Sequence, residues 1–181
     1  MLVVDNTSPF TVDILACLGQ LNISYLCRRF NDVSETDLVA CSSVILSGRR
    51  QYDKKINMFN SRIAKYCYQR YKPLLGICYG AEIIALTFGG SIQKMPNHVH
   101  GMTMISVSDQ NPLVGEKKKI LVYESHRYCI AKLPSNFSSA ARSQYCDHEV
   151  FLNERGIYGT QFHPEKSGGD GLALLKNFSS I

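Results

Sequence analysis

The sequence predicts an α/β fold, in which a mainly parallel central sheet is flanked by helices and carries an antiparallel extension. In the first half of the 181-residue chain, short apolar runs alternate with longer amphipathic segments. This rhythm is typical of parallel strands joined by right-handed helical crossovers. In the second half, strand-like segments follow one another at the spacing of hairpins, which favours antiparallel pairing. No repeat or Pro/Gly/Ser-rich linker divides the sequence, so we expect a single domain over residues 1–181.

The first half supplies the expected parallel strands and the helices that connect them. Short apolar runs predict strands at residues 2–4, 24–27, 43–46 and 73–77. Helices are expected at residues 10–21, 56–71 and 81–88. The first two helices have apolar residues at helical spacing: Val12, Ile14, Leu15, Leu18 and Leu21, then Met58, Phe59, Ile63, Tyr66 and Cys67. Gly89-Gly90 ends the third helix, because glycine readily adopts the conformation that closes a helix.

The second half supplies the expected antiparallel extension and a closing helix. Alternating or apolar runs predict strands at residues 102–107, 119–124, 128–132, 149–152 and 157–162. The last helix is expected at residues 171–178. The sheet therefore changes from parallel to antiparallel pairing along the chain.

Composition and charge exclude several classes of protein. Lys and Arg exceed Asp and Glu by 20 to 15, and the basic residues are scattered except for Lys117-Lys118-Lys119, so no nucleic-acid partner is expected. No apolar stretch approaches the roughly 20 residues of a membrane span. The opening Met1-Leu2-Val3-Val4-Asp5 lacks the charged region and cleavage site of a secretory signal, so none is expected. Seven cysteines without a CxxC pair argue against a disulfide framework and favour a reducing cytoplasm. His98 and His100 have no evident third ligand, so no metal or cofactor is expected.

The segment Gly76-Ile77-Cys78-Tyr79-Gly80 has the pattern of a nucleophile elbow with cysteine in place of serine. It follows a predicted strand and opens a predicted helix. The sharp turn needs small residues two positions before and after the nucleophile. It places the thiol at the positive end of the helix, where the field favours the thiolate. The backbone N–H of Tyr79 points toward the same space and is a candidate oxyanion donor.

A candidate base follows near the C-terminus, in Gln161-Phe162-His163-Pro164-Glu165. Pro164 forces His163 out of the helical region, and residues two apart in an extended segment face the same side. Glu165 is therefore expected to orient the His163 ring, and Cys78, His163 and Glu165 match the nucleophile, base and orienter of a triad. Each motif alone is better explained structurally, as a buried thiol or a surface histidine beside a turn. Together they favour catalysis.

The two motifs resemble those of the class I glutamine amidotransferases, whose triad is a cysteine in G-x-C-x-G and a histidine and glutamate in H-P-E. The similarity extends to the opening Val4-Asp5-Asn6 and Phe10-Thr11 and to the closing Gly171, Leu174-Leu175 and Asn177-Phe178. It covers essentially the whole chain and implies a flavodoxin-like, class I amidotransferase fold.

The resemblance implies a glutaminase. Cys78 would attack the side-chain amide of L-glutamine, His163 would protonate the departing ammonia, and water would hydrolyse the γ-glutamyl thioester. It also implies an oxyanion hole formed by backbone N–H groups of Tyr79 and of Gly48 or Arg49. Substrate contacts fall on Glu82, Ser125 and His126. Because the sequence stops at Ile181 without a synthase domain, we expect the ammonia acceptor to be bound by a separate synthase subunit.

Three positions depart from the family pattern. Ser47-Gly48-Arg49-Arg50 replaces the usual S-G-G-P, and Arg49 would be strained if this loop required a positive φ there. Glu82 replaces a glutamine that helps to hold the substrate; its carboxylate either accepts from the substrate amide, turns away, or repels the α-carboxylate. Glu124-Ser125-His126 matches the family's substrate-contacting stretch only loosely.

The sequence motifs are shared among several synthases that could accept the ammonia. Cys78-Tyr79-Gly80 and Ser125-His126 favour the separate glutaminase subunit of GMP synthase. The opening residues and His100-Gly101 favour anthranilate synthase, and His163-Pro164-Glu165-Lys166-Ser167 is similar to imidazole glycerol phosphate synthase. Two other functions remain: a stand-alone hydrolase of γ-glutamyl amides, with Arg49-Arg50 facing a longer anionic substrate, and a regulatory homologue weakened by Glu82 and Arg49.

Overall fold

A computed structural model describes residues 1–51, 53–108 and 110–181 of the chain. Within these residues the strands form one sheet in the order β2-β1-β3-β4-β9-β8-β7-β5-β6. The parallel half contains β1 (Leu2–Asp5), β2 (Leu26–Arg29), β3 (Val44–Leu46), β4 (Leu74–Ile77) and β9 (Ile157–Thr160). The antiparallel half contains β5 (Ser91–Val107), β6 (Lys119–Lys132), β7 (Ser138–Arg142) and β8 (Val150–Leu152). The predicted α/β class with an antiparallel extension is confirmed. Residues 157–162 were expected in the antiparallel extension, but β9 runs parallel to β4 and joins the two halves through its antiparallel pairing with β8.

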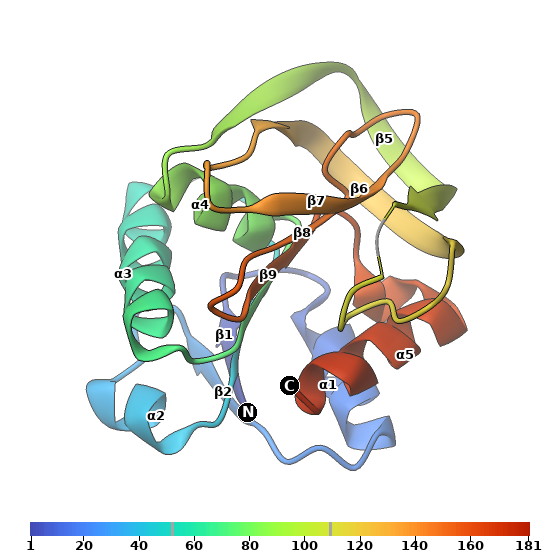
Figure 1. Cartoon of the computed structure of the whole chain (residues 1–181). Helices are drawn as coiled ribbons and strands as arrows, with labels where there is room; N and C mark the ends of the chain where they lie inside the picture. Colours follow the sequence, from blue (N-terminus) through green and yellow to red (C-terminus); the bar gives the residue numbers. More distant parts are fainter. Residues whose placement is uncertain (52, 109) are drawn as a thin grey trace.

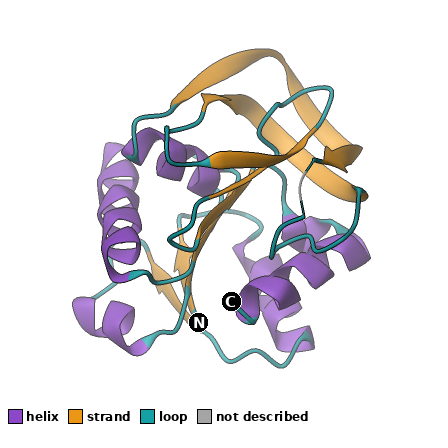
Figure 2. Cartoon of the chain, in the orientation of Figure 1, coloured by secondary structure: helices purple, strands orange, loops and turns teal. Residues whose placement is uncertain are grey.

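Helices cover both faces of the parallel half (Figures 1 and 2). On one face lie α1 (Thr11–Gln20) and α5 (Gly168–Ser179), and on the other lie α3 (Lys54–Arg70) and α4 (Tyr79–Thr87), with the short α2 (Glu35–Ala40) beside α3. Alternate residues of β1 serve the two layers: Val3 packs with α1 and α5, whereas Leu2 and Val4 pack with α3 and α4. The apolar runs read as buried strands are therefore buried on both sides.

Two predicted core positions are wrong. Val12 in α1 is 70% exposed and Met58 in α3 is 51% exposed. Both lie on helices whose other apolar residues, such as Ile14 and Ile63, do face the sheet. Helical spacing identified the buried side of each helix but included one residue too many.

The long β5–β6 hairpin differs most from the expectation. Residues 119–124 and 128–132 were expected as two strands, but β6 runs through both without a break. Its pairing with β5 shifts register between Lys94 and Val99, so the polar stretch around Ser125 is accommodated by an irregularity rather than a turn. His98 and His100, whose spacing is more typical of a polar loop than of a metal site, lie in β5.

Two elements were not predicted. Strand β7 is short and consists mainly of residues with small side chains, so its apolar pattern is weak. Helix α2 has no buried residue, but Ser34 and Asp37 form a capping box at its start, which is a sequence signal for a helix N-terminus. No helix among the described residues is long and apolar enough to cross a membrane.

Candidate active site

The parallel strands bring three distant segments to one edge of the sheet. Gly48 follows β3, Cys78 follows β4 and His163 follows β9, and these strands are neighbours running in the same direction. A Cβ atom placed on Gly48 would lie 3.3 Å from Cε1 of His163 and 3.9 Å from Cβ of Cys78. The segments predicted to carry the nucleophile, the base and an oxyanion donor therefore meet.

The backbone of Cys78 has the strained geometry of a nucleophile elbow. Its φ of 52° and ψ of −107° are unusual for a residue with a side chain. Two hydrogen bonds hold this turn: the N–H of Cys78 donates to the carbonyl of Thr160 at 2.8 Å, and its carbonyl accepts from the N–H of Glu82 at 3.0 Å. Strain that is held by neighbouring strands and a helix keeps the thiol raised above the sheet.

The two glycines of the elbow are required by close backbone contacts. A Cβ atom on Gly76 would lie 2.4 Å from the carbonyl oxygen of Gly80, and one on Gly80 would lie 2.3 Å from that of Leu46. Both distances are far below van der Waals contact, and both neighbours are backbone atoms. The turn can form only when these positions lack side chains.

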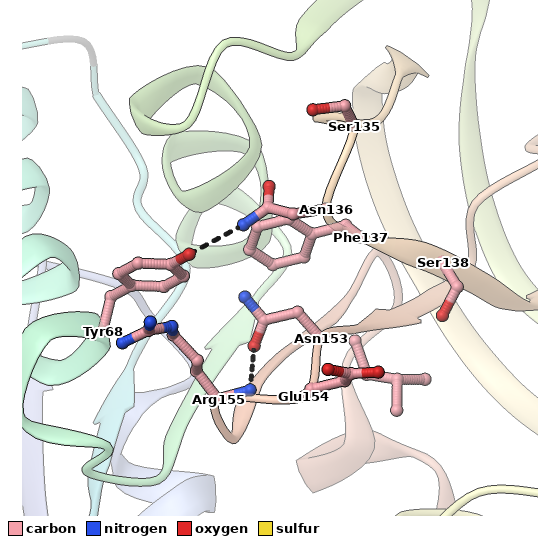
Figure 3. A pocket seen from close by; sticks show the side chains of 9 residues that line it. Tyr68, Ser135, Asn136, Phe137, Ser138, Asn153, Glu154 and Arg155 are labelled. Carbon is pink, nitrogen blue, oxygen red and sulfur yellow. Dashed lines mark hydrogen bonds between the residues drawn. The ribbon is translucent and has the colours of Figure 1, made fainter.

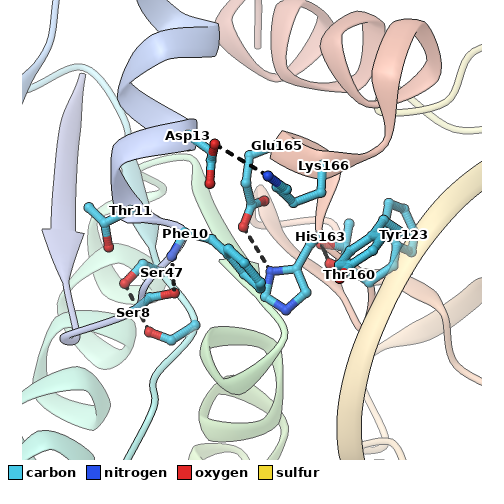
Figure 4. A network of polar contacts seen from close by, with 12 residues as sticks. Ser8, Phe10, Thr11, Asp13, Ser47, Tyr123, Thr160, His163, Glu165 and Lys166 are labelled. Atoms are coloured by element: carbon cyan, nitrogen blue, oxygen red, sulfur yellow. Dashed lines mark hydrogen bonds and ion pairs between the residues drawn. The ribbon is translucent and has the colours of Figure 1, made fainter. Parts of the chain in front are cut away.

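The His163 ring is fixed by its backbone and by an aromatic contact (Figure 4). Its N–H donates to the carbonyl of Tyr123 on β6 at 2.9 Å, and its carbonyl accepts from the hydroxyl of Ser167 at 2.6 Å. The ring of Phe10 packs edge-on against it with ring centroids 4.8 Å apart. The imidazole lies close enough to the Cys78 thiol for each group to shift the pKa of the other.

Glu165 orients the ring, but by a different local structure from the one expected. Nδ1 of His163 donates to Oε1 of Glu165 at 2.8 Å, and both side chains are buried (Figure 4). His163 is extended as Pro164 requires, with φ −103° and ψ 96°. However, Pro164–Lys166 forms a 3-10 turn, η1, rather than a continued strand. The turn folds the carboxylate back onto the ring.

Burial and pairing together determine the protonation of the site. Burial raises the pKa of the Cys78 thiol, and the neighbouring His163 opposes that shift. Burial alone would lower the pKa of His163, but Cys78 and Glu165 together raise it well above its usual value. The positive end of α4 was expected to favour the thiolate of Cys78, and His163 acts on the pKa of the thiol in the same direction.

Two segments expected to provide oxyanion donors lie beside the sulfur. The backbone N–H of Tyr79 lowers the pKa of the Cys78 thiol. On the other side, the Gly48-Arg49 turn is anchored by Asn6, which donates its side-chain N–H to the carbonyl of Ser47 at 2.9 Å and its backbone N–H to the Ser47 hydroxyl at 2.9 Å. Both segments expected to form an oxyanion hole are thus beside the thiol.

Arg49 is accommodated without the strain considered from the sequence. It is not among the residues with positive φ in the described chain. Its guanidinium lies over the Tyr79 ring, 4.0 Å from the centroid, and donates to Oδ1 of Asn57 at 2.9 Å. The Tyr79 hydroxyl donates to the same Asn57 oxygen, also at 2.9 Å. The side chain is therefore turned onto α3 and α4.

A cavity of about 550 Å³ opens over the thiol. Cys78, Tyr79 and Glu82 line one side of it, and Ser125 and His126 line another. Arg49 and Arg50 lie at the same cavity, together with Gln51, Ile92, His98, Arg127 and Tyr128. Every residue predicted to contact substrate therefore lines the cavity that contains Cys78.

Glu82 is buried beside the thiol and faces this cavity rather than turning away. Its Oε1 accepts from the side-chain amide of Gln161 at 3.4 Å. Burial raises its pKa, while Gln161, Arg49 and His126 act in the opposite direction. A carboxylate is thus placed where a glutamine substrate would bind.

Sequence reasoning missed several residues that support the site. Asn6 and Asn60 form a buried pair, with Asn60 donating to Oδ1 of Asn6 at 2.6 Å. Asn6 and Phe10 belong to the opening residues that carried the family resemblance, so a signal existed, but their roles became visible only in three dimensions. Asn60 lies within α3 among apolar neighbours and gave no such signal.

A second cavity, of about 480 Å³, lies at the opposite edge of the sheet (Figure 3). It is lined by Tyr68 of α3 and by Asn153 and Arg155, which precede the start of β9. Its lining includes no cysteine or histidine. It is therefore separate from the thiol and its base.

Comparison with known proteins agrees with this geometry. The model of the class I glutamine amidotransferase family matches residues 2–180. The glutamine-hydrolysing subunit of GMP synthase from Thermoplasma acidophilum is 36% identical over 183 residues, covering 99% of this chain and 90% of that protein. The corresponding subunit from Pyrococcus furiosus is 29% identical over 185 residues, covering 100% of this chain and 97% of that protein.

Solved structures give the same result. A crystal structure of a GMP synthase subunit from Thermoplasma acidophilum superimposes with a TM-score of 0.87 at 33% identity, covering 99% of this chain and 91% of that one. A glutamine amidotransferase from Thermotoga maritima shares the fold, with a TM-score of 0.76 at 20% identity over 91% of this chain and 75% of that one. The chain belongs to the class I glutamine amidotransferase family.

Proposed function

We propose that this chain hydrolyses L-glutamine at Cys78 and supplies the ammonia to a separate synthase subunit of a GMP synthase. The observation that supports it most is the strained Cys78 elbow beside His163, whose ring Glu165 orients through a 2.8 Å hydrogen bond. The similarity to the glutamine-hydrolysing subunits of two GMP synthases supports the choice of acceptor over anthranilate synthase or imidazole glycerol phosphate synthase.

In the first step, the Cys78 sulfur attacks the side-chain amide carbon of glutamine while His163 takes the thiol proton. Glu165 stabilises the resulting imidazolium through Nδ1. The carbonyl oxygen of the amide becomes an oxyanion, which accepts from the N–H of Tyr79 and from an N–H of the Gly48-Arg49 turn. These donors are fixed in advance, so no reorganisation is needed when the charge develops.

In the second step, His163 returns its proton to the amide nitrogen and the C–N bond breaks. Ammonia leaves and a γ-glutamyl thioester remains on Cys78. Water then attacks the thioester, with His163 as its base, and releases glutamate with the thiol restored. Glu82, Ser125 and His126 contact the substrate in the cavity during both steps.

We place this reaction in the cytoplasm. Each of the seven cysteines, all within the described residues, is free, as expected for a protein kept in a reducing environment. A free thiol at position 78 is also what the chemistry requires.

Glutamate and ammonia release from the purified chain tests the proposal. We expect slow turnover by the chain alone, stimulation by the synthase subunit with the substrates from which it makes GMP, and loss of at least ~1,000-fold in kcat on Cys78→Ala. Cys41→Ala, which removes a thiol near the opposite edge of the sheet, should change nothing. Fast, partner-independent turnover of γ-glutamyl amides in preference to glutamine would support the stand-alone hydrolase instead, and no release under any condition would refute both.

A further inference from the structure

Three titratable side chains are buried together behind the wall of the substrate cavity. Glu124 and His126 lie on β6, and Glu149 immediately precedes β8. Glu124 and Glu149 are fully buried and His126 is 4% exposed. One polar atom from each lies within 4.8 Å of the others. None of the steps proposed above uses the two carboxyl groups.

The His126 ring has a fixed proton on Nδ1. This nitrogen lies 2.7 Å from the carbonyl oxygen of Tyr128, which can only accept, so Nδ1 must donate. The other nitrogen, Nε2, lies 3.0 Å from Oε2 of Glu124. That contact also needs a hydrogen, carried either by the ring or by the carboxyl group. With the hydrogen on Nε2, His126 is an imidazolium and Glu124 is its counterion.

The two glutamates need one more hydrogen between them. Oε1 of Glu149 accepts from the Ser143 hydroxyl at 2.7 Å. Oε1 of Glu124 and Oε2 of Glu149 receive no hydrogen bond from any donor in the described chain, although the two carboxyl groups are within hydrogen-bonding reach of each other. Two carboxylates cannot bond in this way unless one is protonated. Burial and the charge of Glu124 raise the pKa of Glu149 well above its usual value, so Glu149 holds that proton.

We propose that Glu124 and Glu149 are positioning residues that share one proton and hold His126 as an imidazolium in the wall of the substrate cavity. The protonated Glu149 donates to the Glu124 carboxylate, and that carboxylate pairs with the ring. The cluster then has one positive and one negative charge and is neutral as a whole, as a buried site requires.

This inference rests on the proposed function, in which glutamine binds in the cavity. Both ring nitrogens of His126 are already bonded, so the ring acts on the substrate through its charge and not through a hydrogen bond. Glu82 on α4 lines the same cavity and interacts electrostatically with His126. A negative and a positive group in one cavity suit the α-ammonium and α-carboxylate of a free amino acid. Among the described residues, the other charged or titratable groups around the cluster include His98 on β5, Arg127 and Cys129 on β6, and Cys146 before β8.

The ring charge of His126 is measured directly by ¹⁵N NMR of histidine-labelled protein, with the signal assigned from a His126→Gln sample. We expect both His126 nitrogens to be protonated at neutral pH in the wild type. In Glu124→Gln, which keeps the hydrogen-bonding shape but removes the counterion, we expect a neutral ring. A neutral ring in the wild type would overturn the proposal, whatever the glutaminase activity, and an imidazolium without any glutaminase activity would refute the proposed function alone.

Kinetics test the consequence for substrate binding. Glu124→Gln should raise KM for glutamine about 10-fold with kcat nearly unchanged, since the positive charge of His126 attracts the substrate equally in the ground and transition states. Glu149→Gln retains an N–H that donates to Glu124 and should keep KM near the wild-type value, whereas Glu149→Val should raise it. Equal KM effects of Glu149→Gln and Glu149→Val would contradict a role for the shared proton.

Binding of one Zn²⁺ per chain by the wild type, lost in Glu149→Gln, would also overturn the proposal, because a divalent cation neutralises the same three groups.

Discussion

The reactivity of Cys78 depends on the residues around it as well as on its position at the start of a helix. Burial raises the pKa of its thiol, and the neighbouring His163 acts in the opposite direction. Arg49, considered from the sequence as a source of strain or as a contact for an anionic substrate, lies over Tyr79 and bonds to Asn57. The departures at this site therefore do not disturb the arrangement of Cys78 and His163.

Glu165→Gln separates the charge of Glu165 from its hydrogen bond. The amide oxygen still accepts from Nδ1 of His163, but the negative charge that helps to raise the pKa of His163 is gone. His163 should then lose its proton at lower pH, so the acidic limb of the kcat/KM profile, which follows the neutral His163 base, moves toward lower pH, and kcat/KM falls by about 100-fold. Glu154→Gln, an exposed site at the opposite edge of the sheet, is the matched control. An acidic limb that stays in place in Glu165→Gln would show that Glu165 does not set the proton affinity of His163.

The elbow between β4 and α4 depends on backbone packing as much as on its cysteine. Gly76 and Gly80 leave no space for side chains, because the carbonyl oxygens of Gly80 and Leu46 occupy it. The requirement is therefore steric. It explains why the G-x-C-x-G pattern was informative in the sequence before any contact was known.

Gly80→Ala should destabilise the protein by about 2 kcal/mol or more and reduce turnover, because the new methyl group must displace the backbone of β3. Gly19→Ala is the control: Gly19 lies in α1, where a new methyl group would meet nothing within 4 Å, and alanine there should stabilise the helix by roughly 0.5–1 kcal/mol. Chemical denaturation of the two variants measures both effects. Equal stability of Gly80→Ala and wild type would contradict the packing described for the elbow.

The molecule as a whole was predictable where its elements are regular. Alternation of strands and helices indicated the parallel half apart from β9, and the two short motifs identified Cys78 and His163 as candidate nucleophile and base. Local patterns failed where contacts between distant segments decide the structure. Residues 125–127 of β6 were not predicted as strand because they are polar, and His126 is buried there through its contact with Glu124. The candidate oxyanion segment also depends on a distant contact, because Asn6, which follows β1, donates to the carbonyl of Ser47.

The most direct test of the account is covalent trapping of the nucleophile by a glutamine analogue that carries a diazoketone in place of the amide. The seven cysteines make the experiment internally controlled, because each can be followed by peptide mass spectrometry. We predict one added group per chain, on Cys78, with labelling suppressed by glutamine and slowed strongly by His163→Ala. Hydrolysis of glutamine with Cys78 unlabelled, or equal labelling of Cys78 and the other cysteines, would contradict the account.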